Sequence, residues 1–266
     1  MENYFVIFAI LALAVLVGST TGFGDSLIFI PLAAIFLDLY VAIVLMGFWT
    51  FALSFFNSIK YRKFFDKSLF KRYLIPGILG VIIGSLLLVI APVRIVEFCL
   101  GVFIIIFVVA KSREYYKIQI GQGSENRIIL SSPELRDIPN KILYPGAFTY
   151  GFVGGLIGTP GPINIVVLER RGHERESLIG NFSIISIFIT SFRLVIYVCY
   201  SLFPVDFILM FIIGIAITYG VSKFGHWLTP KIPKNKFKLL ILLLLTIIGI
   251  RTTIGSTLAI LTNGMF

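Results

Sequence analysis

Two glycine-rich stretches carry the residue types that could bind a small solute, and each interrupts a strongly apolar run. The first stretch covers residues 18–26 and the second covers residues 154–162. Glycine permits backbone conformations and close approaches that side chains forbid. A helix that begins directly after such a turn presents unpaired N–H groups and the positive end of its dipole, and both favour anions. The two stretches therefore predict a paired anion site.

Polar side chains in and near these turns complete the predicted site. Their hydroxyl and amide groups would add hydrogen bonds to a solute. Arg193 lies inside an apolar run, where an unpaired and dry charge costs about 2.5 kcal/mol or more, so it is a candidate counter-ion. The predicted substrate-binding residues are Thr20, Thr21, Gly22, Phe23, Gly24, Asp25, Ser26, Gly158, Thr159, Pro160, Gly161, Asn164 and Arg193.

Each of these groups also has a structural interpretation. The glycines would equally permit close packing of helices in a bilayer. Arg193 either serves an anionic substrate, or snorkels to an interface, or pairs with Asp25. Asp25 either exchanges protons as a coupling group or caps the helix that follows it. Five polar residues in other apolar runs either line a polar path or bond helices together: Asn57, Asn181, Ser183, Ser186 and Thr190.

The composition indicates an integral membrane protein. The 266 residues are 58% hydrophobic and 14% charged, with a mean hydropathy of +0.98. Several apolar runs approach the ~20 residues that cross a bilayer. The net charge of +10 lies in loops between these runs, so it indicates topology and contact with membrane lipid rather than nucleic-acid binding. The runs cover residues 41–59, 73–90, 95–110, 178–203, 207–221 and 237–250.

The residue inventory favours transport over catalysis. The two cysteines lie in apolar runs, and the two histidines lie in or beside charged loops without Glu or Cys at metal-ligand spacing. Asp25 and Arg193 are the only charged side chains that we place at membrane depth, which is too few for an intramembrane enzyme. The chain carries no nucleotide-binding loop, and we expect no metal or other cofactor.

The chain divides into two similar halves. Residues 1–110 and 142–266 each begin with a glycine-interrupted segment and continue with three apolar segments, and residues 111–141 form a predicted cytoplasmic linker. The interrupted segment 4–37 would be about 51 Å long as a helix, which exceeds one span and falls short of two. We therefore predict a hairpin of two half-helices in each half, enclosed by protein or a wet cavity.

Loop charges predict that the halves have opposite orientations. Loop 60–72 has six basic residues and one acidic residue, whereas its counterpart 202–206 has no basic residue. The next loop, 91–94, has one basic residue, whereas its counterpart 229–238 has four. Basic loops stay in the cytoplasm. The expected fold is an all-α polytopic protein of the cell membrane with two inverted repeats, about ten membrane segments (four of them half-length) and both termini extracytoplasmic.

The paired motifs resemble those of the TauE/SafE sulfite exporter family, also called the toluene sulfonate uptake permeases. That family's motif is roughly G-x-x-x-G-x-G-G-G followed by apolar residues and Pro, and both glycine-rich stretches are similar to it. The triple glycine is Gly24-Asp25-Ser26 in the first copy and Gly161-Pro162-Ile163 in the second. The resemblance implies a secondary transporter of a sulfur oxyanion or organosulfonate that works by alternating access between repeats.

Two other functions remain open at this point. The same architecture would serve a passive anion channel, or a proton- or cation-coupled transporter of another small solute. The expected partners are a small anionic solute and membrane lipid, and the sequence leaves a homo-oligomer open.

Overall fold

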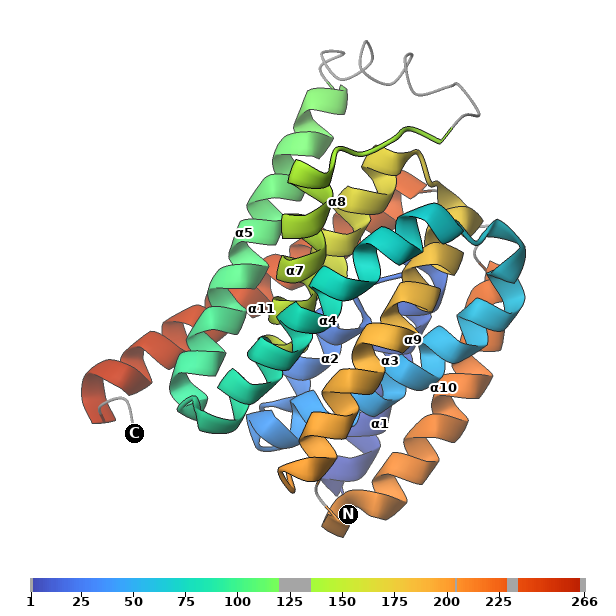
Figure 1. Cartoon of the computed structure of the whole chain (residues 1–266). Helices are drawn as coiled ribbons and strands as arrows, with labels where there is room; N and C mark the ends of the chain where they lie inside the picture. The colour runs from blue at the N-terminus through green and yellow to red at the C-terminus, as the bar shows by residue number, and fades with distance from the viewer. Residues whose placement is uncertain (1, 120–134, 204, 229–233, 264–266) are drawn as a thin grey trace.

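The computed structural model describes residues 2–119, 135–203, 205–228 and 234–263, and every regular element among them is helical. The predicted all-α class is therefore confirmed for these residues (Figure 1). Two short 3₁₀ turns, η1 (Arg62–Phe64) and η3 (Val205–Phe207), accompany ten α-helices in this part of the chain. The helices are α1 (Glu2–Thr21), α2 (Asp25–Ala33), α3 (Leu39–Tyr61), α4 (Lys67–Ile90), α5 (Val93–Gln119), α7 (Asn140–Ile157), α8 (Gly161–Arg171), α9 (Arg175–Cys199), α10 (Ile208–Leu228) and α11 (Lys234–Asn263).

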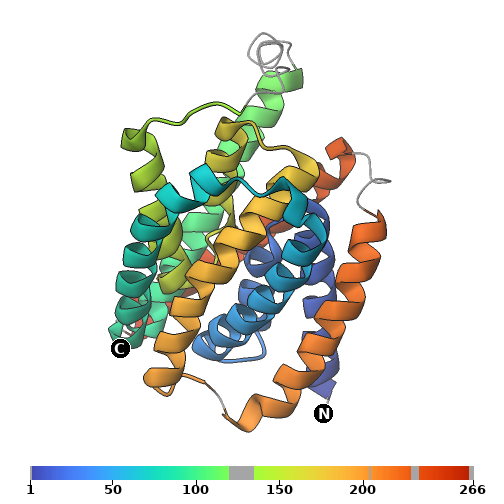
Figure 2. The same cartoon turned by 45° about the vertical axis from the view of Figure 1, so that its right-hand side comes forward.

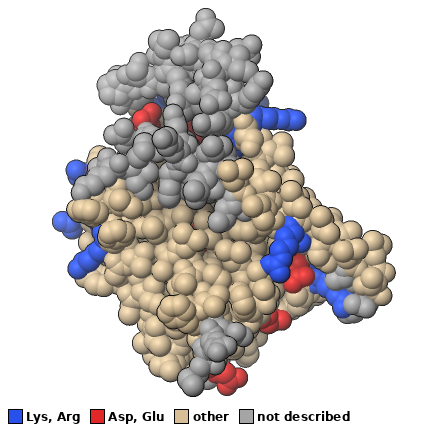
Figure 3. All heavy atoms as spheres, turned by 180° about the vertical axis from the view of Figure 1, so that it is seen from behind, with Lys and Arg blue, Asp and Glu red and all other residues tan. Residues whose placement is uncertain are grey.

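Six of the described helices are long and apolar enough to cross a bilayer, namely α1, α3, α4, α5, α9 and α10. Large apolar side chains on these helices point outward, including Ile75 and Leu209, which are 69% and 68% exposed. Figure 3 shows one face of the molecule, on which uncharged residues cover most of the described surface. Such a surface suits lipid rather than water. The chain is a multi-pass membrane protein.

The two hairpins differ from the predicted pairs of equal half-helices. Helices α2 and α8 have 9 and 11 residues, whereas α1 and α7 have 20 and 18. At about 1.5 Å per residue, α1 alone reaches about 30 Å. The prediction of four half-length helices is therefore wrong for α1 and α7. The glycine turn falls late in each interrupted segment, so only the returning arm is short.

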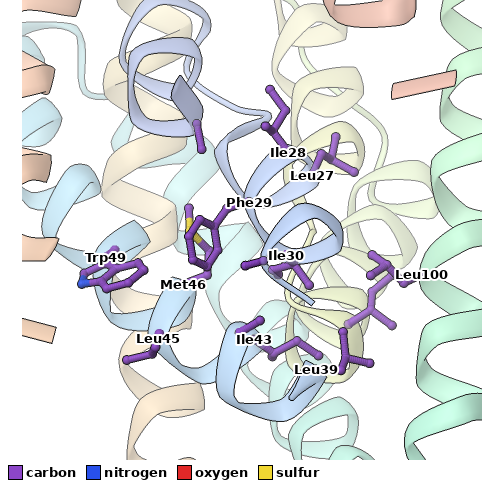
Figure 4. Packing of buried hydrophobic residues seen from close by; sticks show 14 of the residues in the cluster. Leu27, Ile28, Phe29, Ile30, Leu39, Ile43, Leu45, Met46, Trp49 and Leu100 are labelled. Atoms are coloured by element: carbon purple, nitrogen blue, oxygen red, sulfur yellow. The ribbon is translucent and has the colours of Figure 1, made fainter. Parts of the chain in front are cut away.

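Helix α2 is enclosed by protein. The side chains of Leu27, Ile28, Phe29 and Ile30 are at most 1% exposed, although they point in all directions around the helix. Figure 4 shows that Phe29 lies beside Met46 and Trp49 of α3 and that Ile30 lies beside Ile43 of the same helix. The rings of Phe29 and Trp49 meet edge to face with centroids 5.2 Å apart. An apolar helix without a polar face must be surrounded in this way, and the packing holds the N-terminus of α2 in place.

A seam of glycines brings the backbones of α4 and α7 into contact. A Cβ atom at Gly80 would overlap the carbonyl oxygen of Phe148, and one at Gly151 would overlap the carbonyl oxygen of Gly77. Small residues allow helices in a bilayer to approach this closely. Gly155 of the second glycine-rich stretch lies in the same seam, because its Cβ would overlap the backbone of Val81 and Ser85. The structural interpretation is thus confirmed for Gly155, and the seam joins the two halves of the chain.

Several further helix pairs join the halves. Helix α1 packs on α10, α3 packs on α9 and α5 packs on α11, in addition to α4 on α7, and α4 also contacts α9 as α3 contacts α10. Both halves also present the order long, short, long, long, long along the chain. In this order α1, α2, α3, α4 and α5 correspond to α7, α8, α9, α10 and α11. When each helix is exchanged for its counterpart, this set of pairs stays the same. Figures 1 and 2 show the resulting bundle from two directions.

A buried ion pair fastens the loop before α4 to the end of α8. The Asp66 carboxylate accepts a hydrogen bond from Arg171 Nε at 2.9 Å. It also caps α4, because Oδ1 accepts from the backbone N–H groups of Ser68 and Leu69 at 3.0 Å. The backbone N–H of Asp66 donates to Asn181 Oδ1 at 2.8 Å. Asp66 therefore connects the start of α4 to the end of α8 through its carboxylate and to α9 through its backbone N–H.

The environment of this network keeps the ion pair charged. Burial alone would raise the pKa of Asp66, but the hydrogen bond and charge of Arg171 and the N–H of Leu69 bring that pKa below its ordinary value of 3.8. His173 Nε2 lies 3.5 Å from Asp66 Oδ2. Burial is the main cause that lowers the pKa of His173 below its ordinary value of 6.5, so this ring is neutral at physiological pH.

The glycine seam yields a first prediction. Gly80→Ala forces α4 and α7 apart, and we expect it to lower the free energy of unfolding by about 1–3 kcal/mol, as overpacking does. Gly220→Ala on α10 is the matched control, because a Cβ there meets nothing within 4 Å. It should leave stability unchanged or raise it by up to about 1 kcal/mol through helix propensity. Thermal unfolding in detergent measures the stability of both variants. Equal melting temperatures would contradict the close contact of α4 and α7 at Gly80.

The ion pair yields a second prediction, in which Arg171 is tested and the adjacent Arg170 serves as the control. Arg171 is 8% exposed, whereas its neighbour Arg170 is exposed. Arg171→Met leaves the Asp66 carboxylate buried without its partner, and we expect a loss of about 3–5 kcal/mol in stability. Arg170→Met should change stability by no more than about 0.5 kcal/mol. Thermal unfolding at neutral pH compares the two variants. A similar loss of stability in both would show that the ion pair of Asp66 and Arg171 does not stabilise the fold.

Candidate substrate site

The two glycine turns meet inside the protein. A Cβ atom at Gly161 would lie 3.1 Å from Cβ of Phe23 and 3.7 Å from the backbone nitrogen of Gly24. Gly24 is the N-cap of α2, and Gly161 is the first residue of α8. The N-termini of the two short helices therefore lie next to each other, although they come from opposite halves of the chain.

Left-handed glycines form both turns. Gly22 and Gly24 have φ angles of 87° and 89°, and Gly158 has a φ angle of 75°. Other residues rarely adopt this conformation, so a side chain here would be strained. The first N–H groups of a helix have no partner within the helix, and no side chain of the N-cap residue bonds them in α2 or α8. In α2, however, the Asp25 carboxylate interacts with the N–H groups of Asp25 and Ser26. In α8, Pro162 has no N–H, and the N–H of Ile163 donates to the carbonyl oxygen of Pro160 at 3.1 Å. The turns thus bring two helix N-termini to the junction.

The remaining turn residues shape the junction by packing. The ring of Phe23 meets that of Phe107 edge to face at a centroid distance of 6.1 Å. Pro160 is the N-cap of α8 and lies against Gly154, whose Cβ would be 3.1 Å from the proline ring. Gly158 faces α2 and α3, and Ser26 is buried in the first turn of α2.

The hydroxyl groups of Thr20 and Thr21 bond within their own hairpin. Thr20 Oγ1 donates to the carbonyl oxygen of Leu16 at 2.9 Å. Thr21 Oγ1 lies 2.6 Å from the carbonyl oxygen of Phe23 and donates to it. The prediction assigned these O–H donors to a solute, whereas the structure uses them to close the end of α1.

Thr159 and Asn164, by contrast, are buried with polar atoms that have no hydrogen-bond partner. The unpaired atoms are Oγ1 of Thr159 and both amide atoms of Asn164, and both residues are 0% exposed. A buried polar group without a partner costs about 1–3 kcal/mol, so such groups in a native structure require an explanation. Their position at the start of α8 makes them candidates for contact with a polar solute.

Arg193 reaches the junction from α9. Its Nη1 donates to the carbonyl oxygen of Gly154 at 2.8 Å, and its Nε has no partner. A Cβ at Gly47 of α3 would lie 3.1 Å from Nη2, so glycine makes room for the guanidinium. The side chain is 2% exposed and forms no ion pair with Asp25. Of the three interpretations of Arg193, snorkelling and pairing with Asp25 are therefore wrong.

Asp25 does not cap α2, because Gly24 holds the N-cap position and Asp25 is the first helical residue. Its carboxylate instead bonds to α3, where Thr50 Oγ1 donates to Oδ2 at 3.0 Å. Asp25 is 5% exposed, and a Cβ at Gly18 would lie 2.8 Å from its own Cβ. The N-cap position predicted for Asp25 is therefore wrong, although its carboxylate also interacts with the backbone N–H groups of Asp25 and Ser26 in the first turn of α2.

The five polar residues of other runs have different surroundings. Asn57 Oδ1 lies 2.6 Å from Nε2 of His226, a hydrogen bond between α3 and α10. Asn181 belongs to the network around Asp66. Ser183 Oγ has no partner, and Ser186 and Thr190 are buried. The helix–helix interpretation is therefore confirmed for Asn57.

Sequence reasoning missed the tyrosines near the site. The hydroxyl of Tyr150 on α7 lies close to Asn164 and Ser186. Tyr73 on α4 is 0% exposed, its hydroxyl has no partner, and its ring lies 5.7 Å from that of Tyr150. In the sequence these residues are single aromatics in apolar runs, which packing explains equally well, so no local signal singled them out.

The fold and this junction define a polytopic membrane protein with a buried polar site between two halves. The family described as Sulfite exporter TauE/SafE matches residues 7–252, nearly the whole chain. The chain belongs to this family of membrane transporters, as its paired motifs suggested. A search of curated proteins and a search of solved structures found no match to this chain.

The unpaired atoms yield a third prediction, tested on two threonines. Thr159→Val removes a hydroxyl without a protein partner, so we expect unchanged or higher stability in the absence of solute. Thr50→Val removes the donor to the Asp25 carboxylate and should destabilise by about 1.5–3 kcal/mol, the range for a hydrogen bond to a charged group. Thermal unfolding compares the two variants. If Thr159→Val destabilised as much as Thr50→Val, its hydroxyl would be a structural group.

Proposed function

We propose that this protein is a secondary transporter of a small anion of the sulfur oxyanion or organosulfonate class, bound where α2 and α8 meet. One observation carries the proposal. Two helix N-termini from opposite halves face one junction, beside a buried arginine whose Nε has no partner. Backbone N–H groups and helix dipoles favour negative charge at such a place.

The donors at the junction suit an oxyanion with several acceptor oxygens. The amide of Asn164, the hydroxyl of Thr159 and Nε of Arg193 are buried donors without protein partners. Hydrogen bonds from a guanidinium to an anion are among the stronger ones in proteins. The family name supports sulfite or a related anion as the substrate.

We propose two inverted repeats, residues 1–110 and 142–266, joined by the linker 111–141, of which residues 120–134 lie outside the described part. The helix order and the pairing of helices across the halves support this division. In Figures 1 and 2, the beginning of α1 and the end of α11 lie at one end of the bundle, and the end of α5 and the beginning of α7 lie at the other.

Loop charge supports the orientation. The basic loop between α3 and α4 lies at the same end as the start of α7 (Figure 1), and basic loops favour the cytoplasm. Both termini are then extracytoplasmic. The basic loop 229–238 supports the same orientation through its charge, although residues 229–233 lie outside the described part. Rocking of one repeat against the other would expose the junction to each side in turn.

Ligand binding provides the fourth prediction. We expect sulfite, sulfate, thiosulfate, sulfoacetate or taurine to raise the melting temperature of the purified protein, with chloride and phosphate as controls. A ligand at 100 times its Kd adds about 2.7 kcal/mol of apparent stability. Arg193→Gln should abolish the shift, whereas Arg170→Gln, an equal change of charge at an exposed position, should preserve it.

Two outcomes would contradict this function. The first is the absence of a shift with every sulfur anion. The second is a shift that persists in both Gly24→Val and Gly161→Val, because each change distorts one turn of the junction. Uptake into vesicles then separates a transporter from a channel, since only a coupled transporter accumulates the anion against its gradient.

A further inference from the structure

We propose that each anion crosses together with one proton, which the carboxyl group of Asp25 carries. The inference rests on the proposed function and assigns the coupling ion of the same site. It makes the protein a proton–anion symporter, so that an acidic outside drives uptake of the anion.

The Asp25 carboxylate and the Arg193 guanidinium lie near each other but form no ion pair. Thr50 and Gly47 are three residues apart on α3, and such residues share a helix face. Thr50 holds the Asp25 carboxylate at 3.0 Å, and Gly47 lies against the Arg193 guanidinium. Asp25 and Arg193 interact electrostatically, yet they form no ion pair. The guanidinium is instead anchored to the carbonyl oxygen of Gly154.

Charge balance then requires a proton whenever the anion binds. The ionised Asp25 and Arg193 together carry no net charge. A monoanion beside Arg193 takes over the attraction of the guanidinium and leaves the buried carboxylate uncompensated. Buried charges without compensation are strongly disfavoured, and a neighbouring negative charge favours the protonated carboxyl. A proton on Asp25 restores neutrality to the loaded site.

The surroundings of Asp25 accept both protonation states. The Thr50 hydroxyl and the backbone N–H groups of Asp25 and Ser26 donate to the carboxylate. When the carboxyl is protonated, the Thr50 hydroxyl oxygen can accept a hydrogen bond from it, and the other carboxyl oxygen still accepts from the N–H groups. The titratable or charged groups that face Asp25 are Arg193 from α9 and Tyr150 from α7. The charged residues of α1 and α3, Glu2 and Lys60, lie at helix ends, and Arg251 of α11 is exposed.

The transport cycle moves one proton without covalent chemistry on the anion. An O–H bond forms on Asp25 when the site is open to the acidic side and an anion enters. The same bond breaks on the other side when the anion leaves, and the proton passes to water there. For a monoanion the cycle moves no net charge, so a pH difference drives it and a membrane potential alone does not.

The test uses methanesulfonate and sulfate, which stay fully ionised near neutral pH, so that any proton moved belongs to the protein. Purified protein in liposomes is given an outside one pH unit more acidic than the inside. If one proton crosses with each anion, we expect the concentration of methanesulfonate inside to reach about ten times that outside. External alkalinisation should accompany uptake when no pH difference is imposed.

Asp25→Asn keeps the shape of the side chain and removes the proton site. We expect this variant to bind the anion and equilibrate it, but without accumulation and without proton movement. Asp206→Asn, at an exposed carboxylate beside α10, is the matched control and should behave as wild type. If Asp25→Asn fails to fold, the proton movement of the wild-type protein decides the question.

The outcomes separate the two proposals. Anion transport without proton movement overturns the symport and leaves the anion site standing. If Asp25→Asn accumulates the anion to the same level as the wild-type protein, Asp25 does not carry the proton. If neither anion binds in the thermal-shift assay or crosses the membrane, the proposed function fails, and the inference fails with it.

Discussion

The rest of the structure depends on one constraint, which is that backbone N–H and C=O groups at membrane depth must find partners inside the protein. A helix break in the bilayer is therefore tolerated only where the fold surrounds it. The described part of this chain has two such glycine breaks, and both lie at one junction, where the helices that begin there lie among the helices of both halves. Enclosure of α2 by apolar side chains from α3 and its neighbours is the visible result. The same enclosure holds the N-termini of the two short helices next to each other.

Glycine solves three separate problems in this fold. At Gly22, Gly24 and Gly158 it supplies left-handed backbone, which forms the turns. At Gly47 it makes room for the Arg193 guanidinium. Along α4 and α7 it lets two backbones touch and so joins the halves. The structural interpretation is thus confirmed along α4 and α7, whereas the functional interpretation of the turn glycines stays a prediction.

The polar groups of the interior fall into two sets with different roles. Near the start of α4 and the end of α8, Asp66 and Arg171 bond to each other and fasten the two halves, although Nε2 of the neighbouring His173 has no hydrogen-bond partner. At the junction of the turns, donors on Thr159, Asn164 and Arg193 are left without protein partners. Bonded polar groups rigidify one arrangement, whereas buried donors without partners would gain from a polar solute. The larger number of unpartnered donors favours the junction as the candidate site.

The sequence by itself determined the all-helical membrane class, the paired glycine turns and the family, because these follow from apolar length and from residue types that only a few backbone conformations accept. It also indicated Arg193, since a charge in an apolar run is rare. Only the tertiary structure decided the partners of each group. It assigned Asp25 to Thr50 rather than to a helix cap, showed that the arms of the hairpins are unequal, and brought Tyr73 and Tyr150 beside the site. These contacts join residues far apart in the chain, and their local sequence is compatible with ordinary apolar packing.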